Sequence, residues 1–219
     1  GGEGAGIWEK GAMFRFFQVN RDIFLRTLCL VAVTLFFTSA GASQGEIILA
    51  VNTLLMQLFT LFSYVMDGFA YAGEALSGRY IGARNREAFT DTVRHLFGWG
   101  AVIAVLFTLV YALGGNAFLG LLTDDKEVIA VADTYFYWAL AVPAVGIAAF
   151  IWDGIFIGAT RTREMRNAML VSVGCYAVMV AVLPQVLGNN GLWAALMGLN
   201  ALRGLTMWRL YPRVVQAAR

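Results

Sequence analysis

The sequence predicts an all-α integral membrane protein, a bundle of six transmembrane helices. Hydrophobic residues make up 59% of the 219 residues and charged residues only 14%, whereas a soluble domain carries about 25% charged residues. The mean hydropathy is +0.68. Several apolar stretches reach the roughly 20 residues that a helix needs to cross a hydrocarbon core. These stretches lack the alternation of apolar and polar residues that a membrane β-barrel needs.

Six apolar stretches follow one another along the chain. They are Phe24–Gly41, Ile47–Gly73, Leu96–Leu113, Ile129–Gly158, Ala168–Leu187 and Leu192–Leu210. The segments between them carry turn and capping residues, for example the polar run Gly41–Gly45, the acidic run Thr123–Glu127 and the glycine- and asparagine-rich Gly188–Gly191. We expect residues 23–211 to form the six-helix unit. Residues 1–22 would form a lead at the cytoplasmic interface or a linker to another half, and residues 212–219 a cytoplasmic tail.

The basic residues indicate how the helices are oriented. Lysine and arginine stay on the cytoplasmic side of a membrane protein. Apart from Lys126, every lysine and arginine falls before or at the start of the first stretch, between the second and third, between the fourth and fifth, or toward and after the end of the sixth. This distribution predicts that both ends of the chain are cytoplasmic. It also accounts for the basic residues without nucleic-acid binding, since the net charge is only +2.

Residues that usually carry catalysis or bind metals are scarce. His95 is the single histidine, and the two cysteines, Cys29 and Cys175, lie inside apolar stretches. No cysteine and histidine spacing typical of a metal site occurs, and no nucleophile, base and acid can be grouped. We therefore expect no enzymatic activity, no bound metal and no cofactor.

Polar residues in the second stretch fall on one helical face. They recur at intervals of three and four residues, and they are Thr53, Gln57, Thr60, Tyr64, Asp67, Tyr71 and Glu74. A polar face that runs through the bilayer either lines a water-filled cavity or forms a hydrogen-bonded seam with another helix. The cavity interpretation makes Gln57, Tyr64, Asp67 and Tyr71 candidate ligands for a substrate or ion.

Asp153 lies within the fourth predicted span and Glu74 at the end of the second, where charge is costly unless it faces protein or water. Asp153 lies among small residues that allow close helix packing, and it either pairs with an arginine or tyrosine or exchanges a proton with a cavity. Glu74 lies near the cytoplasmic mouth, where it could pair with Arg79 or Arg84 as a gate contact.

Several longer motifs resemble a known transporter family. They are Asn20–Leu28, Asp67–Gly78 followed by Gly82–Arg84, Asp153–Arg161 continuing through Glu164–Asn167, and Ala201–Leu205. Together they resemble the multidrug and toxic compound extrusion (MATE) family, in its DinF-like branch, and correspond to the C-terminal lobe of such a transporter. The acidic residue that the sodium-coupled branch carries in the first helix of this lobe is absent from Phe24–Gly41.

The resemblance implies a secondary transporter of two six-helix lobes around a central cavity, located in the bacterial inner membrane. Such a transporter exchanges organic, often cationic, compounds for H⁺ or Na⁺ by alternating access. The partner of this chain would be the N-terminal lobe of the same transporter. Two alternatives remain: a flippase for a lipid-linked precursor, which would need a strongly cationic cavity, and a membrane scaffold whose polar face serves only packing.

Overall fold

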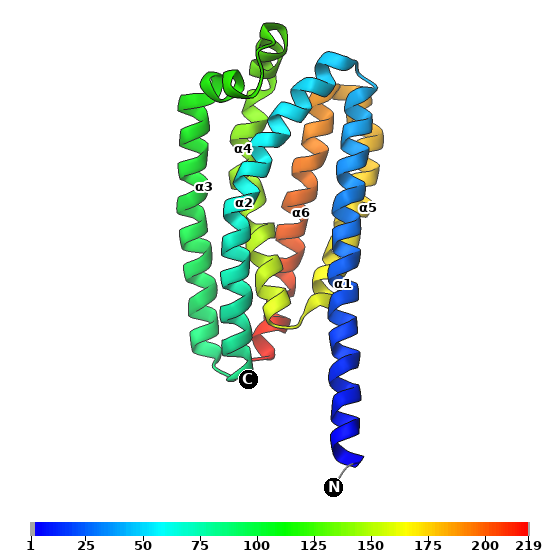
Figure 1. Cartoon of the computed structure of the whole chain (residues 1–219), viewed down its shortest axis with the longest axis vertical. Helices are drawn as coiled ribbons and strands as arrows, with labels where there is room; N and C mark the ends of the chain where they lie inside the picture. The colour runs from blue at the N-terminus through cyan, green and yellow to red at the C-terminus, as the bar shows by residue number, and fades with distance from the viewer. Residues whose placement is uncertain (1–2, 219) are drawn as a thin grey trace.

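Six long helices run side by side, with α4 at the centre of the bundle (Figure 1). A computed structural model describes the backbone of residues 3–218 and the side chains of residues 10–218. The helices are α1 (Glu3–Ala42), α2 (Glu46–Gly82), α3 (Arg86–Leu122), α4 (Lys126–Gly158), α5 (Thr162–Leu187) and α6 (Asn189–Gln216). Within this described part the chain forms no strand. The prediction of an all-α, six-helix bundle is confirmed.

The turns after α1, α3 and α5 fall within or beside the segments Gly41–Gly45, Thr123–Glu127 and Gly188–Gly191. The Asn85 side chain accepts a hydrogen bond from the Ala88 amide at the start of α3. Asp125 does the same for the amides of Glu127 and Val128 at the start of α4. Gly188, which joins α5 to α6, has a φ of 66°, a conformation that glycine adopts without strain.

The helices extend well beyond the apolar stretches. α3 begins at Arg86, before the predicted span Leu96–Leu113, and α6 continues through Pro212 to Gln216. Residues 3–22 continue α1 as one helix, and its N-terminal part projects past the other helices in Figure 1. Residues 1–2 of the expected lead and residue 219 of the expected tail lie outside the described residues. Hydropathy marks the part of a helix that suits lipid and does not mark where the helix ends.

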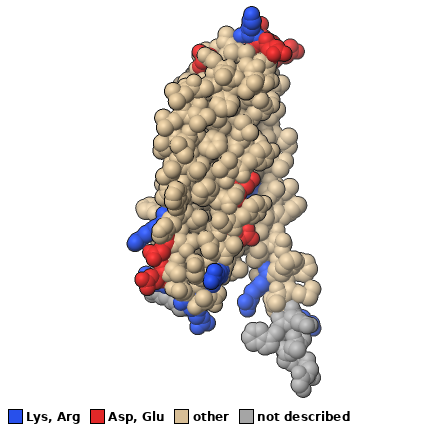
Figure 2. Space-filling view, turned by 60° about the vertical axis from the view of Figure 1, so that its left-hand side comes forward, with Lys and Arg blue, Asp and Glu red and all other residues tan. Residues whose placement is uncertain are grey.

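Five of the six helices, α1 to α5, are long and apolar enough to cross a membrane. α6 is less apolar because it contains Asn200 and Arg203, and both side chains are buried against the other helices. A polar group that faces protein lowers the mean hydropathy of a helix without contacting lipid. Most charged side chains lie toward the two ends of the molecule, and uncharged residues cover most of the middle (Figure 2).

One end of the bundle carries the α2–α3 turn, the α4–α5 turn and the end of α6. We call it the basic end, after Arg79, Arg84, Arg161, Arg163 and Arg213, which lie at or beside these segments.

Glycine brings the backbones of α2 and α4 together. A Cβ on Gly154 would lie 2.2 Å from the carbonyl oxygen of Ala70, and one on Gly158 would lie 2.2 Å from that of Glu74. Both distances are far below any real contact, so no larger residue fits without moving a helix. Small residues permit this kind of close approach between membrane helices. It fixes the height and rotation of α2, which carries the predicted polar face.

Candidate functional site

The polar face of α2 lies on the surface of the bundle. Tyr64 and Tyr71 are 68% and 71% exposed, and Gln57 and Asp67 are also exposed. The opposite face is buried, with Leu55 and Leu58 fully inaccessible. The polar residues therefore do not form a seam with another described helix of this chain.

Hydrogen bonding on the polar face agrees with this placement. The hydroxyls of Thr53 and Thr60 donate to carbonyls one turn back on α2 itself, at 2.8 and 2.9 Å. Threonine commonly satisfies its hydroxyl in this way. The threonines of this face are therefore satisfied within α2, and the exposed side chains of Gln57, Tyr64 and Asp67 can contact groups outside this bundle.

A cavity of about 300 Å³ lies beside the polar face, between α1, α2, α4 and α6. Asp67 from α2 and Asp153 from α4 both line it, together with Arg26 from α1 and Arg203 from α6. The structure therefore brings two of the predicted acidic residues to one cavity. Tyr64, Tyr71 and Gln57 lie on the adjoining surface and do not line the cavity.

Asp153 is held by two arginines. Arg203 Nη2 and Arg26 Nη1 both donate to Asp153 Oδ2, the latter at 3.3 Å. Asp153 is 8% exposed and Arg203 is 4% exposed. Asp153 Oδ1 has no hydrogen-bond partner among the described residues. The structure contains the ion pair of the first interpretation, in which the Asp153 carboxylate compensates two arginines; proton exchange at Asp153 stays a prediction.

Arg26 and Arg203 were missed as site residues by the sequence reasoning, which counted both as orientation signals at the cytoplasmic ends of helices. Arg203 lies inside the bundle, where it pairs with Asp153, and the orientation inferred from these arginines stays a prediction. Both arginines stand next to apolar residues, and Asp153 requires a cation. A buried acid in one span and an arginine within another is the sequence signal that could have identified the pair.

The predicted gate contact is not present. The Glu74 side chain makes no ion pair with Arg79 or Arg84 in the described structure, although its backbone carbonyl packs against Gly158. Arg79 instead lies 5.7 Å from the ring centre of Tyr80. Arg84 occupies the turn after α2 with a φ of 52°. The side chains of Arg79 and Arg84 are exposed. Electrostatic attraction of Glu74 to an exposed arginine is weak.

A second buried acid, Asp22, joins the start of α5 to α1. It is 2% exposed. Thr162 Oγ1 donates to one carboxylate oxygen at 3.0 Å, and Arg166 Nη1 donates to the other at 2.9 Å. Sequence reasoning did not single out Asp22 as a site residue, because it lies beside Arg21 just outside the apolar stretch, where a carboxylate is ordinarily solvated.

Replacing Asp22 with alanine should destabilise the protein. The change leaves Arg166 and Thr162 without their acceptor, and removing one partner of a buried ion pair costs about 3–5 kcal/mol. The thermal unfolding midpoint of the detergent-purified transporter should fall. Asp124→Ala, at an exposed acid in the α3–α4 turn, provides the control and should leave the midpoint unchanged. Equal midpoints for the two variants would contradict a structural role for Asp22.

Comparisons with known proteins agree with this architecture. The family model MatE matches residues 23–183. The chain is 42% identical to DNA damage-inducible protein F of Escherichia coli (strain K12) over 204 residues, which cover 93% of this chain and 44% of that protein. It is 28% identical to the probable multidrug resistance protein NorM of Pseudomonas putida over 138 residues, 60% of this chain and 29% of that protein.

The fold matches as well. The crystal structure of the Vibrio cholerae MATE transporter VcmN in its bent form superimposes with a TM-score of 0.79 at 21% sequence identity, covering 93% of this chain and 46% of that one. This chain thus spans less than half the length of the relatives it matches. The match over residues 23–183 shows that the chain belongs to the MatE family and is a multi-pass membrane protein of that fold.

Proposed function

We propose that the chain is the C-terminal lobe of an efflux antiporter of the bacterial inner membrane. The whole transporter would exchange organic, mostly cationic, compounds for H⁺ or Na⁺ by alternating access, and the N-terminal lobe would be the partner of this chain. One observation carries the proposal: the polar face of α2 is exposed beside a cavity that contains Asp67. A membrane-spanning polar surface needs water, substrate or a second polar surface opposite it.

The roles of individual residues follow from their placement. The exposed rings of Tyr64 and Tyr71 can contact an organic cation through their faces. Asp67 would supply the compensating negative charge, and the Gln57 amide would hydrogen-bond the substrate. Because Asp153 is already paired with two arginines, Asp67 is the carboxylate of this cavity that can take a proton, Na⁺ or a cationic group. Exchange follows if ion and substrate compete for Asp67.

The charges of the cavity favour this function over the flippase alternative. Arg26 and Arg203 are balanced by Asp67 and Asp153 among the lining residues. A lipid-linked precursor carries phosphates and would need an excess of positive charge. For orientation, we propose that the basic end faces the cytoplasm, as lysine and arginine do in membrane proteins generally.

Neutralising Asp67 should impair transport and leave folding intact. In the intact transporter reconstituted into proteoliposomes, Asp67→Asn should lower the rate of cation efflux roughly tenfold, since a hydrogen bond to a charged group contributes about 1.5–3 kcal/mol. Gln57→Ala should cause a smaller loss. Asp133→Asn, at an exposed acid of α4 outside the cavity, is the matched control and should transport normally.

Three other results would reject parts of the proposal. Normal efflux in both Asp67→Asn and Gln57→Ala would remove α2 from the substrate path. A proton gradient and a sodium gradient, imposed in separate vesicle preparations, identify the coupling ion. Efflux that is equally fast when no gradient is imposed would reject antiport. The absence of efflux of any tested cation under either gradient would favour the scaffold alternative.

A further inference from the structure

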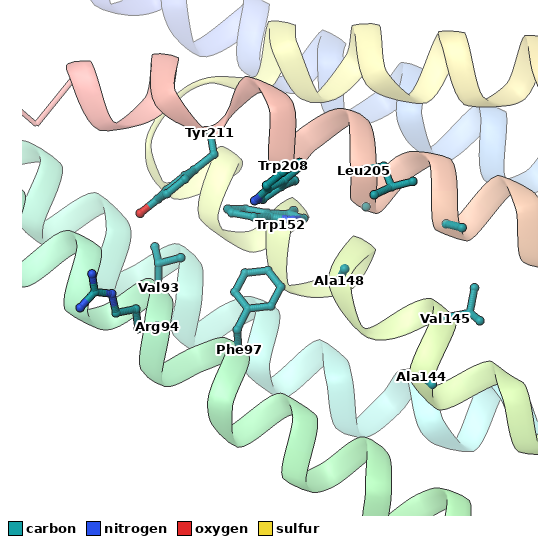
Figure 3. A pocket seen from close by; sticks show the side chains of 12 residues that line it. Val93, Arg94, Phe97, Ala144, Val145, Ala148, Trp152, Leu205, Trp208 and Tyr211 are labelled. Carbon is teal, nitrogen blue, oxygen red and sulfur yellow. The ribbon is translucent and has the colours of Figure 1, made fainter.

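A groove of about 610 Å³ opens between α3 and α6, with α4 as its floor (Figure 3). Its walls are apolar and aromatic, and they include Phe97, Trp152, Leu205 and Trp208. Leu205 and Trp208 are 58% and 62% exposed. α3 and α6 both pack against α4, and they meet each other at the rings of Phe89 and Tyr211, whose centres lie 6.2 Å apart.

The groove lies on the side of α4 that faces away from α2. Ala144, Ala148 and Trp152 line it and recur every four residues along one face of α4. Gly154 and Gly158, which touch the α2 backbone, lie on the other side of α4, because two residues along a helix correspond to a turn of about 200°. The groove is therefore separate from the polar face of α2 and from the proposed substrate cavity.

Positive charge marks one end of the groove. Arg94 lines it, its side chain is exposed, and no acidic residue is among the described lining residues. Arg94 also borders a second, smaller groove of about 300 Å³ along α3, lined by His95, Gly98, Trp99 and Val102. Arg94 thus stands between two apolar grooves. Tyr211 lines the larger groove at the same end as Arg94 (Figure 3), and Arg86 is the first residue of α3.

The groove has positive charge at one end and apolar walls beyond it, in the same order as the headgroup and acyl chains of an anionic phospholipid. A diacyl lipid carries one anionic phosphate at the level of the interface and two acyl chains that run into the bilayer from it. Arg94, Arg86 and Tyr211 lie toward the basic end of the bundle, whereas the apolar walls extend toward its middle. Basic pockets between transmembrane helices on the cytoplasmic side bind anionic headgroups, and an apolar groove beside such a pocket can accommodate the acyl chains.

We propose that the two grooves hold the acyl chains of one anionic diacyl phospholipid, with Arg94 binding its phosphate. The Tyr211 hydroxyl donates a second hydrogen bond, and Arg86 adds positive charge. The bound lipid fills the groove between α3 and α6 and packs over α4. The site is independent of the proposed antiport, because it uses a different face of α4.

Photolabelling of the intact transporter in lipid nanodiscs tests the site directly. The probe is phosphatidylglycerol with a photoreactive diazirine in one acyl chain, and phosphatidylcholine with the same chain is the neutral comparison. Labelled peptides are mapped by mass spectrometry. Peptides of α3 and α6 that contain Phe97, Leu205 or Trp208 should carry about fivefold more label from phosphatidylglycerol, as expected for one arginine at an anionic headgroup.

Two pairs of variants separate headgroup recognition from the apolar groove. Arg94→Gln should reduce phosphatidylglycerol labelling to the level of phosphatidylcholine, whereas Arg213→Gln, an exposed arginine of the same end, should leave it unchanged. Ala144→Trp, which fills the larger groove, should reduce labelling by both lipids. Ala112→Trp, an exposed position of α3 outside both grooves, should not.

Three results would overturn the proposal. They are equal labelling by the two lipids in the unaltered transporter, unchanged labelling in Arg94→Gln, and an equal loss in Arg213→Gln. Loss in Ala144→Trp alone, with Arg94→Gln unchanged, would show a groove that accepts apolar chains without recognising their headgroup, and it would overturn the assignment to an anionic lipid. Transport activity enters none of these measurements, so they stand apart from the test of Asp67.

Discussion

Asp153→Ala should cost the intact transporter most of its folded yield. The substitution leaves Arg203, which is 4% exposed, without its acceptor, and deprives Arg26 of the same oxygen. An uncompensated buried charge costs about 3–5 kcal/mol, a large part of the roughly 5–15 kcal/mol that stabilises a typical protein. Fluorescence-detected size-exclusion chromatography should show a smaller monodisperse peak, and the thermal midpoint of the remaining protein should be lower.

A second variant distinguishes loss of the ion pair from loss of the side chain. Asp153→Leu combined with Arg203→Met removes the carboxylate and the more deeply buried of its two arginines and keeps the packed volume similar, while Arg26, whose side chain is 19% exposed, remains. Exchanging a buried ion pair for apolar residues is often neutral or stabilising, so the double variant should recover much of the folded yield. Asp133→Ala controls for removing an acid from α4. An unchanged midpoint in Asp153→Ala together with lost transport would assign Asp153 to ion coupling.

The sequence was sufficient to predict the number of helices and the places where they turn. The length of an apolar stretch and the residues that cap a helix are local properties, and Asn85, Asp125 and Gly188 act as such residues do elsewhere. The ends of the helices were less predictable. Nothing in the composition of residues 3–22 stops α1, and α6 passes through Pro212. Crossing lipid requires an apolar stretch, whereas a helix can continue through polar residues outside the lipid.

The candidate site was predictable only within a single helix. The period of 3.6 residues placed Gln57, Tyr64 and Asp67 on one face of α2, and they share that face in the structure. The partners of Asp153 depend on how α1, α4 and α6 pack. Arg203 lies 50 residues from Asp153 and Arg26 lies 127 residues from it, and periodicity within one helix carries no information about such contacts.

Alanine at both Gly154 and Gly158 should impair stability and transport together. Each new Cβ would lie 2.2 Å from a carbonyl oxygen of α2. Because backbone cannot yield as a flexible side chain does, α2 must move away from α4. Overpacking of this kind costs about 1–3 kcal/mol at each site. The movement would also carry Asp67 away from Arg26 and Asp153, with which it lines the cavity.

Gly174→Ala is the matched control for this double variant, since a Cβ on Gly174 meets no atom within 4 Å. Alanine is favoured over glycine in a helix by up to about 1 kcal/mol, so the control should be as stable as the unaltered protein or slightly more so. Thermal midpoints and efflux rates of the two proteins, measured in the same proteoliposomes, give the comparison. A double variant that melts and transports like Gly174→Ala would mean that α2 can shift on α4 without disturbing the cavity, and the tight glycine contact would then have no part in placing Asp67.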